Sequence, residues 1–498
     1  MTGLWRMRSV TLLRAWARRD AVSMLSLRTY ASGSRAAKAP IEPMPLPCID
    51  QHETRQSRVM AGSPRTGSPA SQKDEMLGPE PSYTDIVSGY DTFFCDEPFA
   101  LDYGSVLPSY QIAYETWGTL NAARDNAILL HTGLSASSHA ASTPRNTSKG
   151  WWEDFIGPGK ALDTNKFFVV CTNVLGSCYG STGPSSAHPL DADGAPYATR
   201  FPVLSIFDMV RAQFQLLDHL GIDTLYASVG SSLGGMLSIA AAHLFRERVG
   251  RVISISGCAR SAPSGIALRY AQRSVLMADE NWNRGFYYGP NQVQPHKGMK
   301  LARQIATITY RSGPEWEQRF GRRRHTQRSP ALCPDFLVET YLDHQGEQFC
   351  LKYDANSLIY ISKAMDLFDM TDDALAELGA ARMEAHGDDG NLPVERIDHA
   401  PASPKRRPHI TTISHPGAHA YVPSLARGLR RLHDVPILIL GVQSDILFPV
   451  EQQRELAECI RMNGNTSVMY YEIDAPHGHD SFLIDVANVG GAIKGFLN

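Results

Sequence analysis

Short apolar runs alternate with helical patterns through the middle of the chain. Runs that end in Gly or a polar turn read as buried strands, and they are AILLHTG, KFFVVCTNV, TLYASVG, RVISISG and VPILILGV. Between them, SIFDMVRAQFQLLDHLG and GMLSIAAAHLFRERVG carry apolar positions at helical spacing and close on Gly. Strands that alternate with helices predict an α/β fold with a mostly parallel sheet covered on both faces.

The pattern changes between about residues 261 and 435. The segments that read as helices there are 267–278, 300–310, 336–346 and 355–369, and no segment reads convincingly as a strand. A stretch rich in charge, His and Pro follows and predicts a flexible surface excursion at 388–415. The predicted parts are therefore a first part of an α/β core at 84–260, a helical lid at 261–415 and a second part of the core at 416–498.

The N-terminus differs from the rest of the chain in charge. Its first 40 residues hold one acid, Asp20, against the arginines Arg6, Arg8, Arg14, Arg18, Arg19, Arg28 and Arg35. Apolar residues can line one side of a basic helix there, which is typical of a mitochondrial presequence; a disordered basic tail is the alternative. We therefore expect a presequence at 1–40, a disordered Pro-, Ser- and Gln-rich linker at 41–83, and a mitochondrial matrix location.

Composition narrows the function classes. The chain is 43% hydrophobic and 20% charged with a formal net charge of −3, so nothing in it favours a nucleic-acid partner. The sequence has no apolar run of 18 or more residues, so it does not predict a membrane span. The cysteines are scattered without CxxC pairs, and His and Cys lack ligand spacing, so we expect no metal site.

A nucleophile elbow is predicted at Gly230-Ser231-Ser232-Leu233-Gly234, which fits G-x-S-x-G between a strand and a helix. The turn is tight and strained, so small residues must lie two before and two after the nucleophile. Ser232 has Gly at both distances, whereas Ser231 would have Val229 and Leu233. Ser232 is therefore the candidate nucleophile, and a merely structural turn is the alternative.

A serine hydroxyl needs a histidine base that a carboxylate orients. In this fold the acid and then the histidine follow the serine, at the ends of later strands. Asp445 follows VPILILGV, and His479 lies in the loop after VMYYEI. We predict Asp445 and His479 as the partners of Ser232, with Asp474 and His477 as the weaker alternatives.

An oxyanion hole should come from two backbone N–H groups. One belongs to the residue after the nucleophile, Leu233, and the other to the loop after an early strand. Gly133 is the predicted second donor, Leu134 is its alternative, and an ordinary Gly turn would also explain this loop.

Further motifs carry a resemblance to a known family. They are NVLGSCYGSTGPSS, VGSSLGGM, QRSVLMADENW, YLDHQGEQFCLKYDANSLIYISKAMDLFD, SDILFP and GHDSFL. Together they resemble the homoserine O-acetyltransferase family of α/β-hydrolase-fold acyltransferases, most closely its fungal mitochondrial serine O-acetyltransferase branch. The resemblance spans Tyr90 to Asn498 but excludes the presequence, the linker and the long insertion from Asp373 to His415.

The resemblance implies a ping-pong reaction without a permanently bound cofactor. Ser232 would take an acetyl group from acetyl-CoA, and His479, held by Asp445, would activate an amino-acid hydroxyl as the acceptor. Arg273 would hold the carboxylate of that acceptor and Asp480 its amine. A salt bridge within the lid is the alternative for Arg273, and a helix N-cap is the alternative for Asp480. The resemblance also implies a homodimer formed through the lid.

The acceptor and the donor are the finest of these expectations. Serine is one methylene shorter than homoserine, a difference worth about 1–3 kcal/mol in a pocket, so Leu134 and Ser135 in the loop after the early strand could select between them. We expect serine as acceptor, with homoserine as the alternative, and acetyl-CoA as donor, with succinyl-CoA as the alternative. The alternatives of another class are a lid-gated esterase and a non-catalytic interaction protein of the same fold.

Overall fold

The apolar runs form the centre of one sheet. A computed structural model describes residues 87–289, 292–324, 332, 334–387 and 420–498. The predicted strands are β5 (Ala127–His131), β8 (Phe168–Thr172), β9 (Ala227–Ser231), β10 (Val252–Ile255), β11 (Ile437–Val442) and β12 (Val468–Ile473). They lie parallel to one another in the order β8-β5-β9-β10-β11-β12. The predicted α/β fold is confirmed.

Two further strands extend this sheet beyond β8. They are β1 (Asp91–Cys95) and β4 (Tyr110–Trp117), and β4 runs antiparallel to both of its neighbours. The apolar pattern did not predict them, because β4 carries polar residues such as Gln111 and the buried Glu115. Glu115 lies 2.9 Å from Nδ1 of His139, a partner that only the tertiary structure provides. Short pairs complete the strands: β2 (Phe99–Ala100) with β3 (Val106–Leu107), and β6 (Ile156–Gly157) with β7 (Leu162–Asp163).

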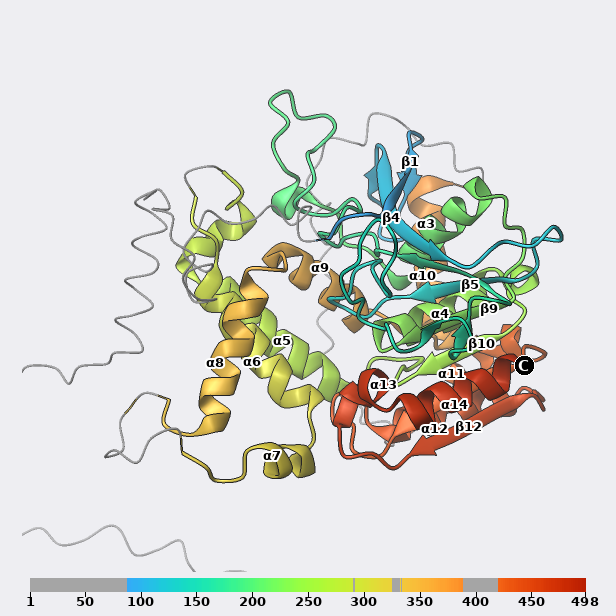
Figure 1. Cartoon of the computed structure of the whole chain (residues 1–498). Coiled ribbons are helices and arrows are strands. Elements are labelled where there is room, and N and C mark those ends of the chain that lie inside the picture. Colours follow the sequence, from blue (N-terminus) through green and yellow to red (C-terminus); the bar gives the residue numbers. More distant parts are fainter. Residues whose placement is uncertain (1–86, 290–291, 325–331, 333, 388–419) are drawn as a thin grey trace, which may run out of the picture. The chain divides into compact units, whose positions relative to one another are not determined.

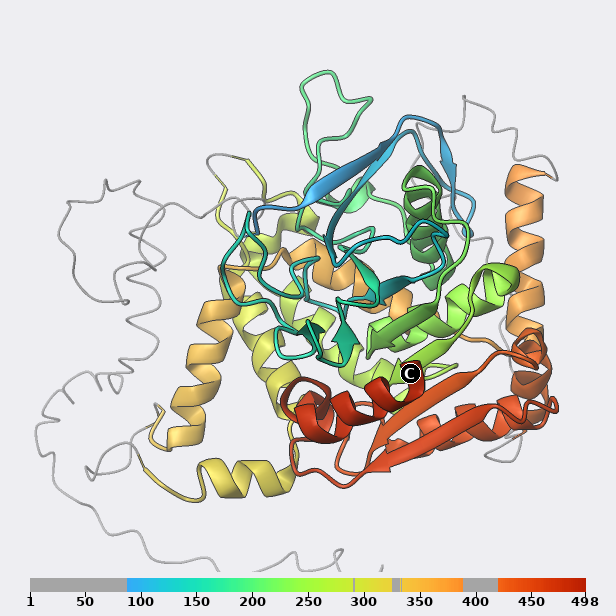
Figure 2. The same ribbon diagram turned by 45° about the vertical axis from the view of Figure 1, so that its right-hand side comes forward.

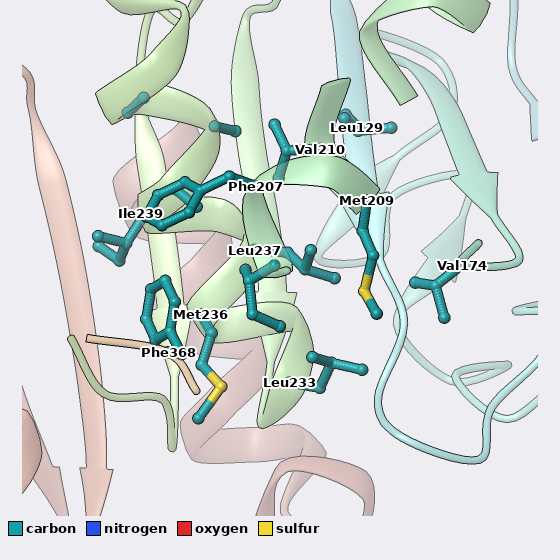
Figure 3. Packing of buried hydrophobic residues seen from close by; sticks show 14 of the residues in the cluster. Leu129, Val174, Phe207, Met209, Val210, Leu233, Met236, Leu237, Ile239 and Phe368 are labelled. Carbon is teal, nitrogen blue, oxygen red and sulfur yellow. The ribbon is translucent and has the colours of Figure 1, made fainter. Parts of the chain in front are cut away.

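Successive residues of the central strands pack into two different cores. Leu129 of β5 lies in the cluster that includes helices α3 (Ile206–His219), α4 (Leu233–Leu244) and α12 (Val450–Arg461). Its neighbours Ile128 and Leu130 lie in the cluster that includes α14 (Val486–Leu497). Figure 3 shows side chains of α3 and α4 packed together beside Leu129. Both faces of the sheet are therefore covered, which explains why its strands are nearly uniformly apolar.

The regular elements described between β10 and β11 are helices and 3-10 turns, joined by loops. The helices are α5 (Pro263–Met277), α6 (His296–Tyr310), α7 (Gly313–Arg319), α8 (Leu337–Cys350), α9 (Ala355–Asp366), α10 (Asp372–His386) and α11 (Val422–Gly428). α6 contacts both α5 and α8, and the three helices form a group apart from the central sheet (Figures 1 and 2). α9 instead packs into the core with α3 and α4, through Ile361, Ala364 and Met365. The predicted helices of the insertion thus match α5, α6, α8 and α9.

The chain closes with α13 (Ser481–Ile484) and α14, and its 3-10 turns include η4 (Glu280–Gly285) and η7 (Gly478–Asp480). The predicted presequence, the linker and the excursion at 388–415 lie outside the described residues. No described helix is both long enough and apolar enough to cross a membrane.

Candidate active site

Ser232 lies at the junction of β9 and α4 in a strained conformation. Its φ is 59° and its ψ is −121°, values that an L-residue rarely adopts outside such a turn. The flanking glycines are required by space: a Cβ on Gly230 would lie 2.1 Å from the carbonyl oxygen of Gly234. A Cβ on Gly234 would lie 2.4 Å from the carbonyl oxygen of His131. The structure therefore has the geometry that the G-x-S-x-G pattern predicted, with Ser232 as its central residue.

Three side chains from distant parts of the sequence meet at this turn. The Oγ of Ser232 lies 2.8 Å from Nε2 of His479, and Nδ1 of His479 lies 2.6 Å from Oδ2 of Asp445. Because Nδ1 faces a carboxylate, it carries the proton, and Nε2 is left to accept from the serine hydroxyl. All three side chains are buried. The structure thus brings together the three residues predicted as nucleophile, base and acid.

The surroundings of His479 hold the ring and tune its charge. The imidazole stacks on Phe448 with 5.1 Å between ring centroids and meets the edge of Phe482 at 5.3 Å. Burial, the largest single influence, lowers the pKa of His479, but the charge and hydrogen bond of Asp445 and the charge of Asp480 together raise it above its ordinary value. The ring is therefore oriented for proton transfer and stabilised in its protonated form.

Asp445 is fixed by the backbone that follows it. Its Oδ1 accepts hydrogen bonds of 2.9 Å from the backbone N–H groups of Leu447 and Phe448, which leaves Oδ2 for the histidine. The alternative acid, Asp474, is exposed to solvent. His479, and not the alternative His477, bonds to Ser232 and Asp445. The geometry therefore supports the predicted Asp445 and His479 and excludes their weaker alternatives, Asp474 and His477.

The predicted oxyanion donors lie on both sides of the elbow. Leu233 is the first residue of α4, so its N–H has no carbonyl one turn earlier in the helix to bond to. The end of β5 packs against the start of α4 at Gly234, which brings the loop that begins with Gly133 next to the elbow. A Cβ on Gly133 would meet no heavy atom within 4 Å, and Leu134 and Ser135 beside it are partly buried. The carbonyl oxygen of Leu134 accepts a 2.7 Å hydrogen bond from the hydroxyl of Tyr353.

Arg273 and Asp480 each have a partner other than the triad. Arg273 is buried on α5, where it pairs with Asp366 of α9 and lies 3.2 Å from the hydroxyl of Ser362. Arg269 pairs with the same carboxylate at 2.5 Å, so two cations share one anion. This is the salt bridge that the sequence allowed as an alternative. Among the described residues, Arg273 and Asp480 share no hydrogen bond or ion pair.

Asp480 directly follows His479 and lies 3.4 Å from a guanidinium nitrogen of Arg311. It occupies the N-cap position of α13, but its side chain makes no capping hydrogen bond there. Burial raises the pKa of Asp480, and the charges of Arg311, His479 and Arg303 partly offset this rise. The alternative reading of Asp480 as a helix cap therefore has no hydrogen bond to support it.

The structure adds charged residues that no sequence motif singled out. Arg303 and Arg311 lie on and just after α6, and Asp366 lies at the end of α9. Helical periodicity predicted these elements but could not indicate that the charges of Arg303 and Arg311 approach Asp480, or that Asp366 pairs with Arg273. Among the described residues, no group of three or more His, Cys, Asp or Glu side chains is arranged to hold a metal ion.

Comparisons with known proteins agree with the fold and the motifs. A family model described as alpha/beta hydrolase fold matches residues 126–486. A serine O-succinyltransferase of Emericella nidulans is 54% identical over 491 residues, covering 95% of this chain and 92% of the relative. One of Schizosaccharomyces pombe is 50% identical over 525 residues, covering 98% of this chain and 99% of the relative.

Solved structures show the same likeness. A homoserine O-acetyltransferase from Bacillus anthracis is 26% identical with a TM-score of 0.65, covering 82% of this chain and 97% of that one. Esterase E22 is 25% identical with a TM-score of 0.66, covering 82% of this chain and 100% of that one. The chain therefore belongs to the α/β-hydrolase family and, within it, to the homoserine and serine O-acyltransferase family that its motifs resemble.

Proposed function

We propose that the chain transfers an acyl group from a CoA thioester to the hydroxyl of L-serine through an acyl-Ser232 intermediate, with succinyl-CoA as donor. The hydrogen-bonded array of Ser232, His479 and Asp445 carries the proposal that the protein is catalytic. The names of relatives 50% and 54% identical along nearly the whole chain favour serine as acceptor. They also favour succinyl-CoA over acetyl-CoA, the donor expected from the sequence, which is kept as the alternative.

The first half-reaction loads the enzyme. The Oγ of Ser232 attacks the thioester carbonyl while Nε2 of His479 accepts its proton, and Asp445 stabilises the imidazolium that forms. The backbone N–H groups of Leu233 and Gly133 donate to the oxyanion of the tetrahedral intermediate. When the C–S bond breaks, His479 returns the proton to sulfur, and CoA leaves as the free thiol. The acyl group remains as an ester of Ser232.

The second half-reaction repeats these steps with the acceptor. His479 takes the proton of the L-serine hydroxyl, whose oxygen attacks the acyl ester, and the proton then returns to Oγ of Ser232. Asp480 holds the ammonium group of the acceptor, and Arg273 holds its carboxylate. The two arginines that share Asp366 leave one positive charge unbalanced in that group, which supports an anionic ligand beside Arg273. Leu134 and Ser135 limit the length of the acceptor side chain.

A thiol-release assay tests this proposal. Purified protein is given succinyl-CoA or acetyl-CoA with L-serine, L-homoserine or no acceptor. We expect the fastest CoA release with succinyl-CoA and L-serine, and a loss of about 10⁴-fold or more in the Ser232→Ala variant. Ser231→Ala is the matched control, since the Oγ of Ser231 is buried beside the nucleophile and has no hydrogen-bond partner. CoA release that no acceptor accelerates would contradict the proposal.

The similarity to esterase E22 supports a second candidate, a lid-gated esterase. Such an enzyme would use water as acceptor through the same three residues. It would hydrolyse p-nitrophenyl acetate or succinate rapidly, and L-serine would not compete for the acyl group. Product analysis by mass spectrometry separates the two functions, because only the transferase forms an O-acyl amino acid.

We also propose that residues 1–40 direct the protein to the mitochondrial matrix. The proposal rests on the seven arginines and the single acid of this segment. A fluorescent protein fused after residue 40 should enter mitochondria in a yeast cell. Replacing Arg14, Arg18 and Arg19 by Glu should leave it in the cytosol, and an unchanged distribution would refute the proposal.

A further inference from the structure

The C-terminal end of α6 is fixed against the turn that carries His479. A Cβ on Gly478 would lie 2.7 Å from the carbonyl oxygen of Tyr310, the last residue of α6. The hydroxyl of Ser312 donates a hydrogen bond to the carbonyl oxygen of Pro476 in the same loop. The residues of α6 that share a face with Tyr310 are therefore held in a defined position relative to the histidine. Arg303 is one of them, because residues seven apart lie on the same side of a helix.

Arg303 is enclosed by aromatic rings rather than by acids. Its guanidinium carbon lies 4.4 Å from the ring centroid of Phe349 and 5.2 Å from that of Tyr310. Its Nε is buried and has no hydrogen-bond partner, and no described carboxylate lies within ion-pairing distance of it. The neighbouring arginines differ in this respect, since Arg311 pairs with Glu315 and Asp480 and Arg273 pairs with Asp366. A partly buried guanidinium that makes no ion pair is poorly stabilised by the chain alone.

The same arginine is linked to the loop on the other side of Ser232. Phe349, on which Arg303 lies, stacks with Tyr353 at 5.4 Å between ring centroids. The hydroxyl of Tyr353 donates to the carbonyl oxygen of Leu134 at 2.7 Å, in the loop that holds the proposed oxyanion donor Gly133. The charge of Arg303 also reaches Asp480, whose pKa it lowers together with Arg311 and His479 against the stronger effect of burial. Arg303 is thus connected to both walls of the site, the histidine turn and the loop after β5.

Resting on the proposed acyl transfer through Ser232, we infer that Arg303 binds the distal carboxylate of a dicarboxylic acyl group and so selects the donor. A guanidinium presents a planar set of N–H donors that matches a carboxylate, and the contact of Arg303 with the ring of Phe349 restricts where those donors can lie. A succinyl group would supply the missing anion, whereas an acetyl group would leave the guanidinium unpaired. The carboxylate takes no part in bond making or breaking, so Arg303 is a specificity residue.

The test compares donors within single protein preparations. Full-length wild type, Arg303→Met and Arg303→Lys are assayed for kcat/KM with succinyl-CoA and with acetyl-CoA, each at saturating L-serine. Methionine keeps the apolar contact with Phe349 but removes the charge. We expect it to lower the ratio of kcat/KM for succinyl-CoA to that for acetyl-CoA by about 100-fold or more. The lysine variant should fall between wild type and Arg303→Met.

Arg319→Met is the matched control, since Arg319 also lies over aromatic rings, 4.8 Å from the centroid of Tyr341. It should leave the ratio of the two donors unchanged. The ratio does not depend on the fraction of protein that is folded, so partial unfolding cannot imitate the expected result. An equal loss with both donors in Arg303→Met would overturn the inference.

Wild-type protein that transfers acetyl and succinyl groups to L-serine equally well would also overturn the inference about Arg303, while acyl transfer itself would stand. Wild-type protein that shows no serine-dependent CoA release with either donor would instead overturn the proposed function. The two failures are therefore distinguishable in the same assay.

Discussion

At the scale of single residues, the charge of Asp445 decides the behaviour of His479. Burial among Phe448 and Phe482 alone would lower the pKa of the imidazole. The carboxylate at 2.6 Å and the nearby Asp480 reverse that effect. His479 must be neutral to accept the serine proton, so activity should be lost as the pH falls through this raised pKa.

Asp445→Asn should therefore change both the rate and the pH profile. The variant keeps the shape of the acid but removes its charge, so we expect kcat to fall by about 10³–10⁴-fold. The pKa of His479 should fall, and the acidic limb of the residual activity should move to lower pH. The dependence of kcat/KM on pH for both proteins checks this. An acidic limb that stays in place, or moves to higher pH, would contradict this account of His479.

At the scale of elements, the connection from β9 to α4 places the nucleophile. The strand, the strained Ser232 and the helix are compatible only because Gly230 and Gly234 leave room for backbone atoms. Gly234 also lets the start of α4 approach the end of β5, and so sets the spacing between Leu233 and the loop at Gly133. The glycines thus determine the local turn and the position of the proposed oxyanion donors.

Gly234→Ala should be destabilising and should impair catalysis together. Its Cβ would lie 2.4 Å from a backbone oxygen, so α4 must shift, at a cost of about 1–3 kcal/mol. The melting temperature and kcat should both decrease. Gly495→Ala in α14 is the control, because a Cβ there meets no atom within 4 Å and should raise stability by about 0.4–1 kcal/mol. Similar melting temperatures for the two variants would show that the close approach at Gly234 is unimportant.

At the scale of the whole molecule, the helical insertion completes the site that the sheet begins. The sheet supplies Ser232, Asp445 and His479 from the ends of its strands or the loops after them. The insertion adds Arg303 and Arg311 near the histidine turn and Tyr353 beside the loop after β5. We therefore propose that the loops after the sheet strands and the helical insertion together line the pocket around the reacting atoms.

Tyr353→Phe should uncouple the insertion from that loop. The variant keeps the ring stacking but loses the 2.7 Å hydrogen bond to Leu134, which leaves a partly buried carbonyl unpaired at a cost of about 1 kcal/mol. We expect a several-fold lower kcat. Tyr179→Phe is the control, because it loses a 2.7 Å hydrogen bond to Lys352, outside the loop. Steady-state kinetics of both variants measure the difference, and an equal loss of kcat would contradict the coupling.

Local patterns were sufficient to predict the central strands, α3, α4 and the helices of the insertion. Buried parallel strands are uniformly apolar, and amphipathic helices repeat their apolar positions, so both are visible in a single sequence. Strands β1 and β4 were missed because β4 mixes apolar with polar residues, and its buried Glu115 finds its hydrogen-bond partners, Ser138 and His139, in another loop. The helix α9 was predicted, but its place in the core, rather than in the lid, was not.

By itself, the sequence determined the fold class and the identity of the candidate nucleophile. The steric demand of the elbow is local, so the spacing of Gly230 and Gly234 was enough to distinguish Ser232 from Ser231. The sequence also predicted Asp445 and His479 as the partners of Ser232. Only the tertiary structure excluded Asp474 and His477, paired Arg273 with Asp366, and left Arg303 without an ion pair among the described residues. Electrostatic contacts depend on distances between residues far apart in the chain, and folding alone sets those distances.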